Sequence, residues 1–333
     1  MLPDILIIGG GAAAMTAALY SLRAGRSVKL IEKQAFGGQI ADSPRVENFP
    51  SIKEISGMEW SNNLFEQISA LGAEFEMDEV KSIEKKGDNF VAHCEYGDYE
   101  GRAVIIASGV KHRHLGIPGE NLNGVFSANE FLTRNNLMKA FREDYLTPIH
   151  AGKKCCVVGG GNVAMDAART ALRLGADTSI IYRRTEVELP ARKEEVHHAK
   201  EEGIDFQMLT NPVEILADEN GWVRALKCIR MELGEPDESG RRSPVPIPGS
   251  EFEIPTETVI MALGTAPNPL IVKTTNGLEA TRRGGLVADE EGRTTREGIF
   301  AGGDAVTGAA TVILAMGAGR KAAKAIDEYL KSK

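Results

Sequence analysis

The stretch GGGAAAMTAALYSLRAG at residues 9–25 returns as GGGNVAMDAARTALRLG at residues 159–175. A short apolar run precedes each copy, DILII at 4–8 and KCCVV at 154–158, and such runs are typical of buried parallel strands. Each copy ends in LRxG, which stops a helix, and a second apolar run follows, SVKLIEK or TSIIYRR. The sequence therefore predicts an α/β fold in which strand, glycine turn, helix and strand occur twice.

The glycines of the repeated stretch have a mechanical role. Gly9 allows a tight turn, Gly11 lets backbone amides approach a pyrophosphate, and Ala14 keeps the helix close to the strand. The matching positions in the second copy are Gly159, Gly161 and Ala164. One such turn is weak support for a ligand, because glycine-rich turns begin many helices. Two copies in the same context predict two Rossmann-like dinucleotide-binding domains, and the alternative is two purely structural turns.

The two copies differ at the end of the second strand. In the first copy the residue at this strand end is Glu32, which is well placed to accept hydrogen bonds from ribose hydroxyls. The corresponding residue in the second copy is Tyr182, and Arg183 and Arg184 follow it. An acid there would repel a 2′-phosphate, whereas guanidinium groups match it, so the pair predicts NADP(H). Arg192 is a weaker candidate for a third contact, and a solvated basic strand end is the alternative.

Composition narrows the class of protein. The 333 residues carry a formal charge of −8, which argues against a general attraction to nucleic acid or to an anionic membrane. The apolar opening ILII is too short for a signal peptide or a membrane span, so we expect a cytoplasmic protein. Four cysteines without a C-x-x-C pair suggest a reduced compartment. No residue cluster indicates a metal site.

Longer motifs carry a family resemblance. GGGAAAMTAALY, FGGQIADSPRVENFP, ASG and GIFAGGDA resemble the FAD domain of the low-molecular-weight thioredoxin reductases, within the pyridine-nucleotide-disulfide oxidoreductase superfamily. Residues 127–270 instead resemble the NADPH domain of the glutamate synthase small subunit, through GGGNVAMDAARTALRLGA, YRRTEVELPAR and MELGEPDESGRR. The resemblance implies a thioredoxin reductase-like architecture of three-layer ββα domains. An FAD domain would comprise residues 1–118 and 275–333, with an NAD(P)H domain, 119–274, inserted.

The resemblance also implies the cofactors, FAD and NADP(H), and their contacts. Members of the superfamily pass hydride between the nicotinamide and the flavin, so the reactive chemistry belongs to the cofactors and we name no catalytic side chain. By motif match, the FAD contacts would be Gly9, Gly11, Ala14, Glu32, Gly38, Gln39, Asn48, Gly303 and Asp304, and the NADP(H) contacts would be Gly161, Asn162, Val163, Arg183 and Arg184.

The chain departs from both relatives. Thioredoxin reductases carry a C-x-x-C before the second nucleotide-binding strand, and the corresponding segment here has no cysteine. The cysteine-rich iron–sulfur domain of glutamate synthase small subunits is also missing from these residues. We therefore expect electrons to be exchanged with a separate iron–sulfur or ferredoxin-type protein, within a larger redox complex. The alternatives are a disulfide reductase with an unconventional cysteine and a non-catalytic dinucleotide-binding subunit; family analogy also suggests a homodimer.

Overall fold

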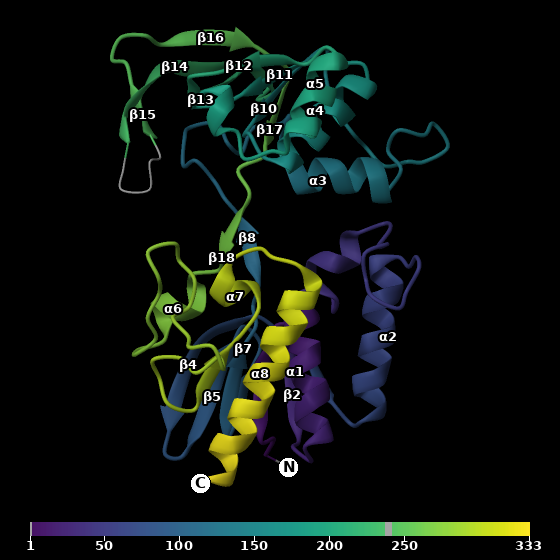
Figure 1. The fold of residues 1–333 in the computed structure, drawn as a ribbon, viewed down its shortest axis with the longest axis vertical. Coiled ribbons are helices and arrows are strands. Elements are labelled where there is room, and N and C mark those ends of the chain that lie inside the picture. The colour runs from purple at the N-terminus through teal and green to yellow at the C-terminus, as the bar shows by residue number, and fades with distance from the viewer. Residues whose placement is uncertain (1, 237–241) are drawn as a thin grey trace. The chain divides into compact units, whose positions relative to one another are not determined.

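The chain folds into two compact units (Figure 1). The computed structural model describes residues 2–236 and 242–333. The first unit comprises Met1–Lys111 and Thr265–Lys333, and the second comprises His112–Gly264. The second unit is therefore an insertion within the first.

The boundaries between the units differ slightly from those expected from the sequence. The chain leaves the first unit after residue 111 rather than 118, and returns at residue 265 rather than 275. Strands β8 (Val110–His112) and β18 (Thr265–Pro267) pair as a two-stranded sheet where the chain crosses between the units. Strands of three residues are too short to leave a periodic pattern in the sequence.

The centre of the first unit is a five-stranded parallel sheet. In spatial order its strands are β19 (Ile299–Ala301), β7 (Ala103–Ile106), β1 (Ile5–Ile8), β2 (Val28–Glu32) and β3 (Glu74–Met77). Strand β1 lies in the middle with all four side chains buried. Successive side chains point to opposite faces, so Ile5 and Ile7 pack in one core while Leu6 and Ile8 pack in another. Burial on both faces explains the unbroken apolar run.

Two further layers cover this sheet. Helices α1 (Ala12–Arg23), α2 (Gly57–Ala70) and α8 (Val312–Lys331) pack on one face, and the antiparallel strands β4 (Val80–Lys86), β5 (Asn89–Cys94) and β6 (Asp98–Gly101) pack on the other. Helices α1 and α8 approach closely, because a Cβ atom on Gly319 would lie 2.2 Å from the carbonyl oxygen of Ala13. The short elements η1 (Gly38–Asp42), α6 (Leu270–Thr274) and α7 (Asp304–Thr307) complete the unit.

The second unit repeats this plan. Its parallel sheet has the order β12 (Asp205–Gln207), β11 (Asp177–Ile181), β10 (Lys154–Val158), β17 (Thr258–Met261) and β9 (Val125–Ser127). One face is covered by α3 (Ala128–Leu132), α4 (Asn162–Arg173) and α5 (Lys193–Glu201), and the other by β13 (Thr210–Ala217), β14 (Val223–Pro236), β15 (Arg242–Pro246) and β16 (Phe252–Pro255). The π-helical turn η2 (Thr133–Leu137) follows α3, and the 3-10 turn η3 (Glu186–Glu188) precedes α5.

Both predicted copies of strand, glycine turn, helix and strand are present, and the α/β fold class with two Rossmann-like units is confirmed. The copies also share a register: Ile5 pairs with Val28 in the first, and Cys155 pairs with Thr178 in the second. Cys155 and its neighbour Cys156 point into different cores, as strand alternation predicts. Within the described residues, no helix has both the length and the apolarity needed to cross a lipid bilayer.

Candidate dinucleotide-binding sites

The first glycine turn joins β1 to α1. Gly9 has a φ of +114°, and a Cβ atom on it would lie 2.3 Å from the carbonyl oxygen of Ala107, so no larger residue fits. Gly11 is the N-cap of α1 and supplies no side chain to the free amides of the first helical turn, which also lacks an acid. These amides and the helix dipole form a site suited to an anion.

Glu32 supports this turn from the end of β2. Its Oε2 accepts the N–H of Gly10 at 2.6 Å, and its Oε1 accepts the N–H of Gln34 at 2.9 Å. A carboxylate oxygen has lone pairs for more than one donor. The two amides therefore fix the orientation of Glu32 and leave acceptor capacity for the hydroxyls of a ribose.

Two other segments converge on the same turn. Gly38 has a φ of +64°, and a Cβ atom there would lie 2.9 Å from the Cα of Gly11. A Cβ atom on Gly303, which follows β19, would lie 2.7 Å from the Cβ of Ala13 in the first turn of α1. Both positions need glycine because a Cβ atom would collide with a neighbouring segment of the chain. The structure thus brings together the sequence-predicted residues around Gly9, Gly11, Ala14, Glu32, Gly38 and Gly303.

Asp304 is the first residue of α7, directly after Gly303. Burial raises the pKa of its carboxyl group, and a hydrogen bond from the backbone N–H of Ala310 partly opposes that shift. Gln39, the second residue of η1, is exposed beside Gly38. Asn48 is exposed in the loop between η1 and α2, and within the described residues no hydrogen bond joins it to the glycine turn.

The second glycine turn joins β10 to α4. Gly159 has a φ of +144°, and a Cβ atom on it would lie 2.3 Å from the carbonyl oxygen of Ala262. A Cβ atom on Gly161 would have no protein atom within 4 Å. Beside this open space lie Asn162 and Val163, both exposed although Val163 is apolar. The arrangement leaves room for a ligand at the amino end of α4, where again no side chain caps the helix.

Tyr182 takes the position that Glu32 has in the first unit. A Cβ atom on Gly160 would lie 2.7 Å from the ring of Tyr182, whose hydroxyl donates to the carbonyl oxygen of Glu188 at 2.8 Å. The ring therefore supports the second turn by packing, and its hydroxyl is already engaged. An aromatic ring here leaves the strand end without the acid that would repel a 2′-phosphate.

The structure separates the two arginines that follow. Arg183 is exposed, whereas Arg184 is only 7% exposed and its Nε has no hydrogen-bond partner in the described chain. Asn162 accepts the backbone N–H of Arg192 at 2.9 Å, which ties the glycine turn to the start of α5. Arg230 on β14, which the sequence did not single out, also lies next to this strand end. No spacing rule could have found it, because β13 and a left-handed turn bring it there.

The four cysteines are free thiols, and three of them are buried. Burial raises the pKa of Cys94 and of Cys228 to about 12, and that of Cys156 to about 11. Burial also raises the pKa of Cys155. Thiols, unlike thiolates, are poor nucleophiles. In the described segments, no group of three or more His, Cys, Asp or Glu side chains is placed to hold a metal ion.

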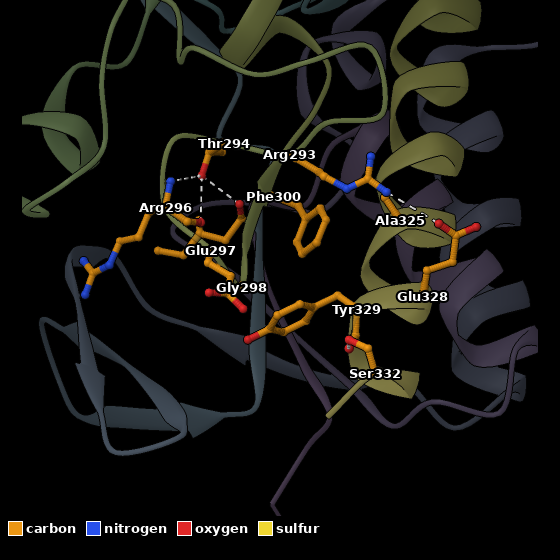
Figure 2. A pocket seen from close by; sticks show the side chains of 11 residues that line it. Arg293, Thr294, Arg296, Glu297, Gly298, Phe300, Ala325, Glu328, Tyr329 and Ser332 are labelled. Atoms are coloured by element: carbon orange, nitrogen blue, oxygen red, sulfur yellow. Dashed lines mark hydrogen bonds and ion pairs between the residues drawn. The ribbon is translucent and has the colours of Figure 1, made fainter.

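A separate cavity of about 500 Å³ opens at the other end of β19 (Figure 2). Figure 2 shows the rings of Phe300 and Tyr329 facing this cavity and Arg293 reaching towards Glu328. The ring centroids lie 6.0 Å apart, and Nη2 of Arg293 lies 3.5 Å from Oε2 of Glu328. The cavity lies at the amino end of the strand, and Gly303 follows its carboxyl end. None of the sequence-predicted site residues lines it.

Comparisons with known proteins agree with this arrangement. Residues 3–324 match the family described as pyridine nucleotide-disulphide oxidoreductase. NADP(+)-dependent formate dehydrogenase subunit beta of Moorella thermoacetica is 38% identical over 335 residues, which cover 98% of this chain and 44% of that protein. Glutamate synthase (NADPH) small chain of Halomonas elongata is 40% identical over 236 residues, which cover 68% of this chain and 50% of that protein.

Among solved structures, thioredoxin reductase of Lactococcus lactis superposes with a TM-score of 0.78 at 26% identity, covering 99% of this chain and all of that one. The likeness extends over both units of the fold. The chain spans about half the length of the curated relatives it matches, with shares of 44% and 50% in the two named above.

Proposed function

The chain belongs to the pyridine nucleotide-disulphide oxidoreductase family, and we propose that it moves hydride between NADP(H) and FAD. In this proposal it exchanges electrons with a separate iron–sulfur or ferredoxin-type protein. The family and its glutamate synthase and thioredoxin reductase members use FAD and NADPH. One observation carries the proposal: two equivalent glycine turns are followed by different strand ends, Glu32 in one and Tyr182 with two arginines in the other.

The first unit fits FAD. The free amides at Gly11 suit a pyrophosphate, and Glu32, fixed by two backbone amides, suits a ribose. Asp304 lies across the turn on α7, where a carboxylate can accept hydroxyls of the ribityl chain. The glycines at 38 and 303 let three chain segments close around one ligand. We therefore assign FAD to the first unit.

The second unit fits NADP(H). The open space at Gly161 and the uncapped helix α4 suit the pyrophosphate. Arg184, buried with an unpartnered Nε, requires an acceptor that the described residues do not provide. A 2′-phosphate offers oxygens of the right geometry and charge. This is the strongest feature of the site in favour of NADP(H) over NAD(H).

When bound, FAD supplies a ring that takes up hydride and passes electrons on. The residues of this chain bind and orient the two nucleotides; they need not transfer a proton themselves. In this proposal the electrons then leave by a redox centre in another protein. The cysteines of this chain are disfavoured as such a centre, because their pKa values lie far above neutrality and none has a second cysteine at C-x-x-C spacing.

The names of the relatives support assembly with other chains. One is a subunit beta and the other a small chain. We therefore propose that this chain works as the nucleotide-binding, flavin-containing part of a larger redox complex. We also place it in the cytoplasm, where four free thiols are stable.

An anaerobic titration tests the proposal. Purified protein should contain flavin, and NADPH should bleach its visible absorbance band at far lower concentration than NADH. Reduced protein should then pass electrons to a ferredoxin but not to a disulfide substrate such as oxidised thioredoxin. A preparation without flavin, or a flavin that stays oxidised under excess NADPH and NADH, contradicts the proposal.

The same assay separates the alternatives. Rapid turnover with an artificial dye acceptor excludes a purely structural subunit. Disulfide reduction that disappears when the cysteines are replaced would instead identify a thiol-dependent enzyme. Affinity purification followed by iron analysis tests the partner, because an iron-rich companion is expected.

A further inference from the structure

Several described arginines of the second unit differ in whether a carboxylate lies nearby. Five form ion pairs with carboxylates within 4.0 Å: Arg134, Arg142, Arg169, Arg173 and Arg224. Arg242 on β15 has no such carboxylate either, but it donates to the backbone carbonyl oxygens of Leu233 and Gly234. Four others also have no carboxylate within that distance among the described residues: Arg183, Arg184, Arg192 and Arg230. Arginines on a protein surface usually find acidic neighbours, and an unpaired group of them suits an anionic ligand. All four lie at or beside the end of β11.

Arg184 is the buried member of this group of four. A buried guanidinium with an unsatisfied donor is costly, and its Nε, which has no hydrogen-bond partner, cannot be satisfied by bulk water. The half-buried Arg169 on α4 has no such need, because Glu202 accepts two of its hydrogen bonds. The site around Arg184 is therefore organised for a ligand that brings negative charge.

A left-handed turn places Arg230 beside Arg184. Leu209 has a φ of +50°, its N–H donates to the carbonyl oxygen of Arg184 at 3.0 Å, and its own carbonyl oxygen accepts the N–H of Met231 at 2.8 Å. The next residue, Thr210, donates its N–H to the carbonyl oxygen of Tyr182 at 3.0 Å. One side of this turn thus binds the end of β11, and the other binds β14 at residue 231.

The guanidinium of Arg230 is held by two contacts, but no carboxylate of the described residues neutralises its charge. It stacks over the ring of Phe252 at 4.0 Å from the centroid, and its Nη1 donates to Oγ1 of Thr210 at 3.3 Å. A guanidinium has five N–H donors in a fixed plane. The stack sets that plane, and the single hydrogen bond leaves most donors for a ligand. A stacked arginine also loses less conformational freedom when it binds.

We propose that Arg230 is a third cation of the 2′-phosphate subsite and a specificity-determining residue for NADP(H) over NAD(H). This rests on the proposed function, since it assumes that the second unit binds a nicotinamide dinucleotide. Arg184 supplies the buried charge from the end of β11, and Arg230 approaches the same phosphate from β14. Phe252 and Thr210 act as positioning residues for Arg230.

The test compares two probes that differ in the phosphate alone, 2′,5′-ADP and 5′-AMP, by titration calorimetry on the purified protein. Neither probe needs the flavin. Loss of one charge-assisted hydrogen bond should weaken 2′,5′-ADP about ten- to hundredfold in Arg230→Met. Binding of 5′-AMP should stay within about twofold of wild type. Arg230→Lys keeps the charge but not the fork, and should give an intermediate loss.

Arg224→Met is the matched control, because Arg224 is an exposed arginine of the same strand that already pairs with Glu253 at 3.2 Å. It should leave both affinities unchanged. If Arg230→Met folds poorly, Phe252→Leu loosens the stack without touching the charge and should also reduce the preference for 2′,5′-ADP. Unchanged affinity in the Arg230 variants, or an equal loss for both probes, overturns the inference.

Failure of the inference can be told apart from failure of the proposed function. If the wild-type protein is reduced by NADPH but the Arg230 variants keep their preference, only the role of Arg230 is wrong. If the wild-type protein binds neither 2′,5′-ADP nor NADPH, both are wrong.

Discussion

The carboxylate of Glu32 accepts the N–H of Gly10 at 2.6 Å, so the acid expected to bind a ribose also holds the glycine turn in shape. In the second unit the ring of Tyr182 supports Gly160 by packing instead. The residue at the end of the second strand thus supports the glycine turn in both copies, through a hydrogen bond in one and through packing in the other. The choice of contact decides which ribose the site can accept, because a carboxylate binds hydroxyls and excludes phosphate.

Replacing Glu32 should therefore cost flavin. In Glu32→Ala the ribose loses its acceptor and two backbone amides lose theirs, so FAD affinity should fall at least about tenfold. The ratio of flavin absorbance to protein absorbance after dialysis measures the loss. Glu74→Ala is the control, since Glu74 is an exposed acid on the neighbouring strand β3 that pairs with Lys29. A Glu32→Ala protein with full flavin content would refute the assignment.

Two glycines of the second turn should respond differently to the same substitution. Gly159→Ala places a methyl group 2.3 Å from the carbonyl oxygen of Ala262 at a φ of +144°, so it should destabilise the second unit by several kcal/mol. Gly161→Ala meets no protein atom within 4 Å and should keep nearly the wild-type melting temperature. Its methyl group would instead occupy the space expected for a pyrophosphate.

The expected signature of Gly161→Ala is thus a loss of at least about tenfold in NADPH affinity with unchanged flavin content and stability. Calorimetry and thermal unfolding measure the two quantities separately. Normal NADPH binding in this variant would place the nucleotide elsewhere.

Replacing Arg184 should affect stability and nucleotide binding in different ways. Arg184→Met removes a buried, unpaired guanidinium and keeps much of the side-chain volume. The free energy of unfolding of the nucleotide-free protein should stay the same or rise by about 1–2 kcal/mol. Preference for NADPH over NADH should fall about ten- to hundredfold. Chemical denaturation measures the free energy of unfolding, and nucleotide titration measures the preference for NADPH. A destabilised variant that still prefers NADPH would contradict the role assigned to Arg184.

The double variant Arg183→Glu with Arg184→Ser extends this test. An acid at the strand end should repel the 2′-phosphate, so NADPH binding should weaken far more than NADH binding. Equal losses for the two nucleotides would contradict the assignment of the phosphate to this strand end.

The glycine turns could be predicted because their constraints are local. Gly9 and Gly159 need left-handed backbone beside a neighbouring strand, and that requirement leaves a fixed spacing in the sequence. Glu32 followed from the same spacing, since paired parallel strands fix its position relative to the turn. Arg230 could not be found in this way. Its place depends on the turn at Leu209 and on strand pairing with β13, which are not encoded in a short motif.

The sequence pattern also does not distinguish Arg183 from Arg184, although the structure buries Arg184 and exposes Arg183. Adjacent residues beyond a strand end leave it in different directions, and only the packed structure shows which side is covered. The residues at which the chain crosses between the units are hard to predict for a related reason, because the three-residue strands β8 and β18 are defined by their pairing.

The cysteines provide the last prediction, since their burial bears on how electrons leave the chain. The folded protein holds the protons of Cys94 and Cys228 up to a pKa of about 12, against an ordinary value of 9.0. Thiol reagents should therefore react slowly with the native protein near neutral pH and rapidly after denaturation. Because the unfolded chain releases these protons first, this contribution to stability is complete below pH 9 and is lost as the pH rises towards 12. Replacing all four cysteines by alanine should lower stability by about 1 kcal/mol per buried site but leave NADPH-dependent reduction of a dye within about twofold of wild type. A large loss of that activity, with flavin content and fold retained, would show that a thiol of this chain takes part in the electron path.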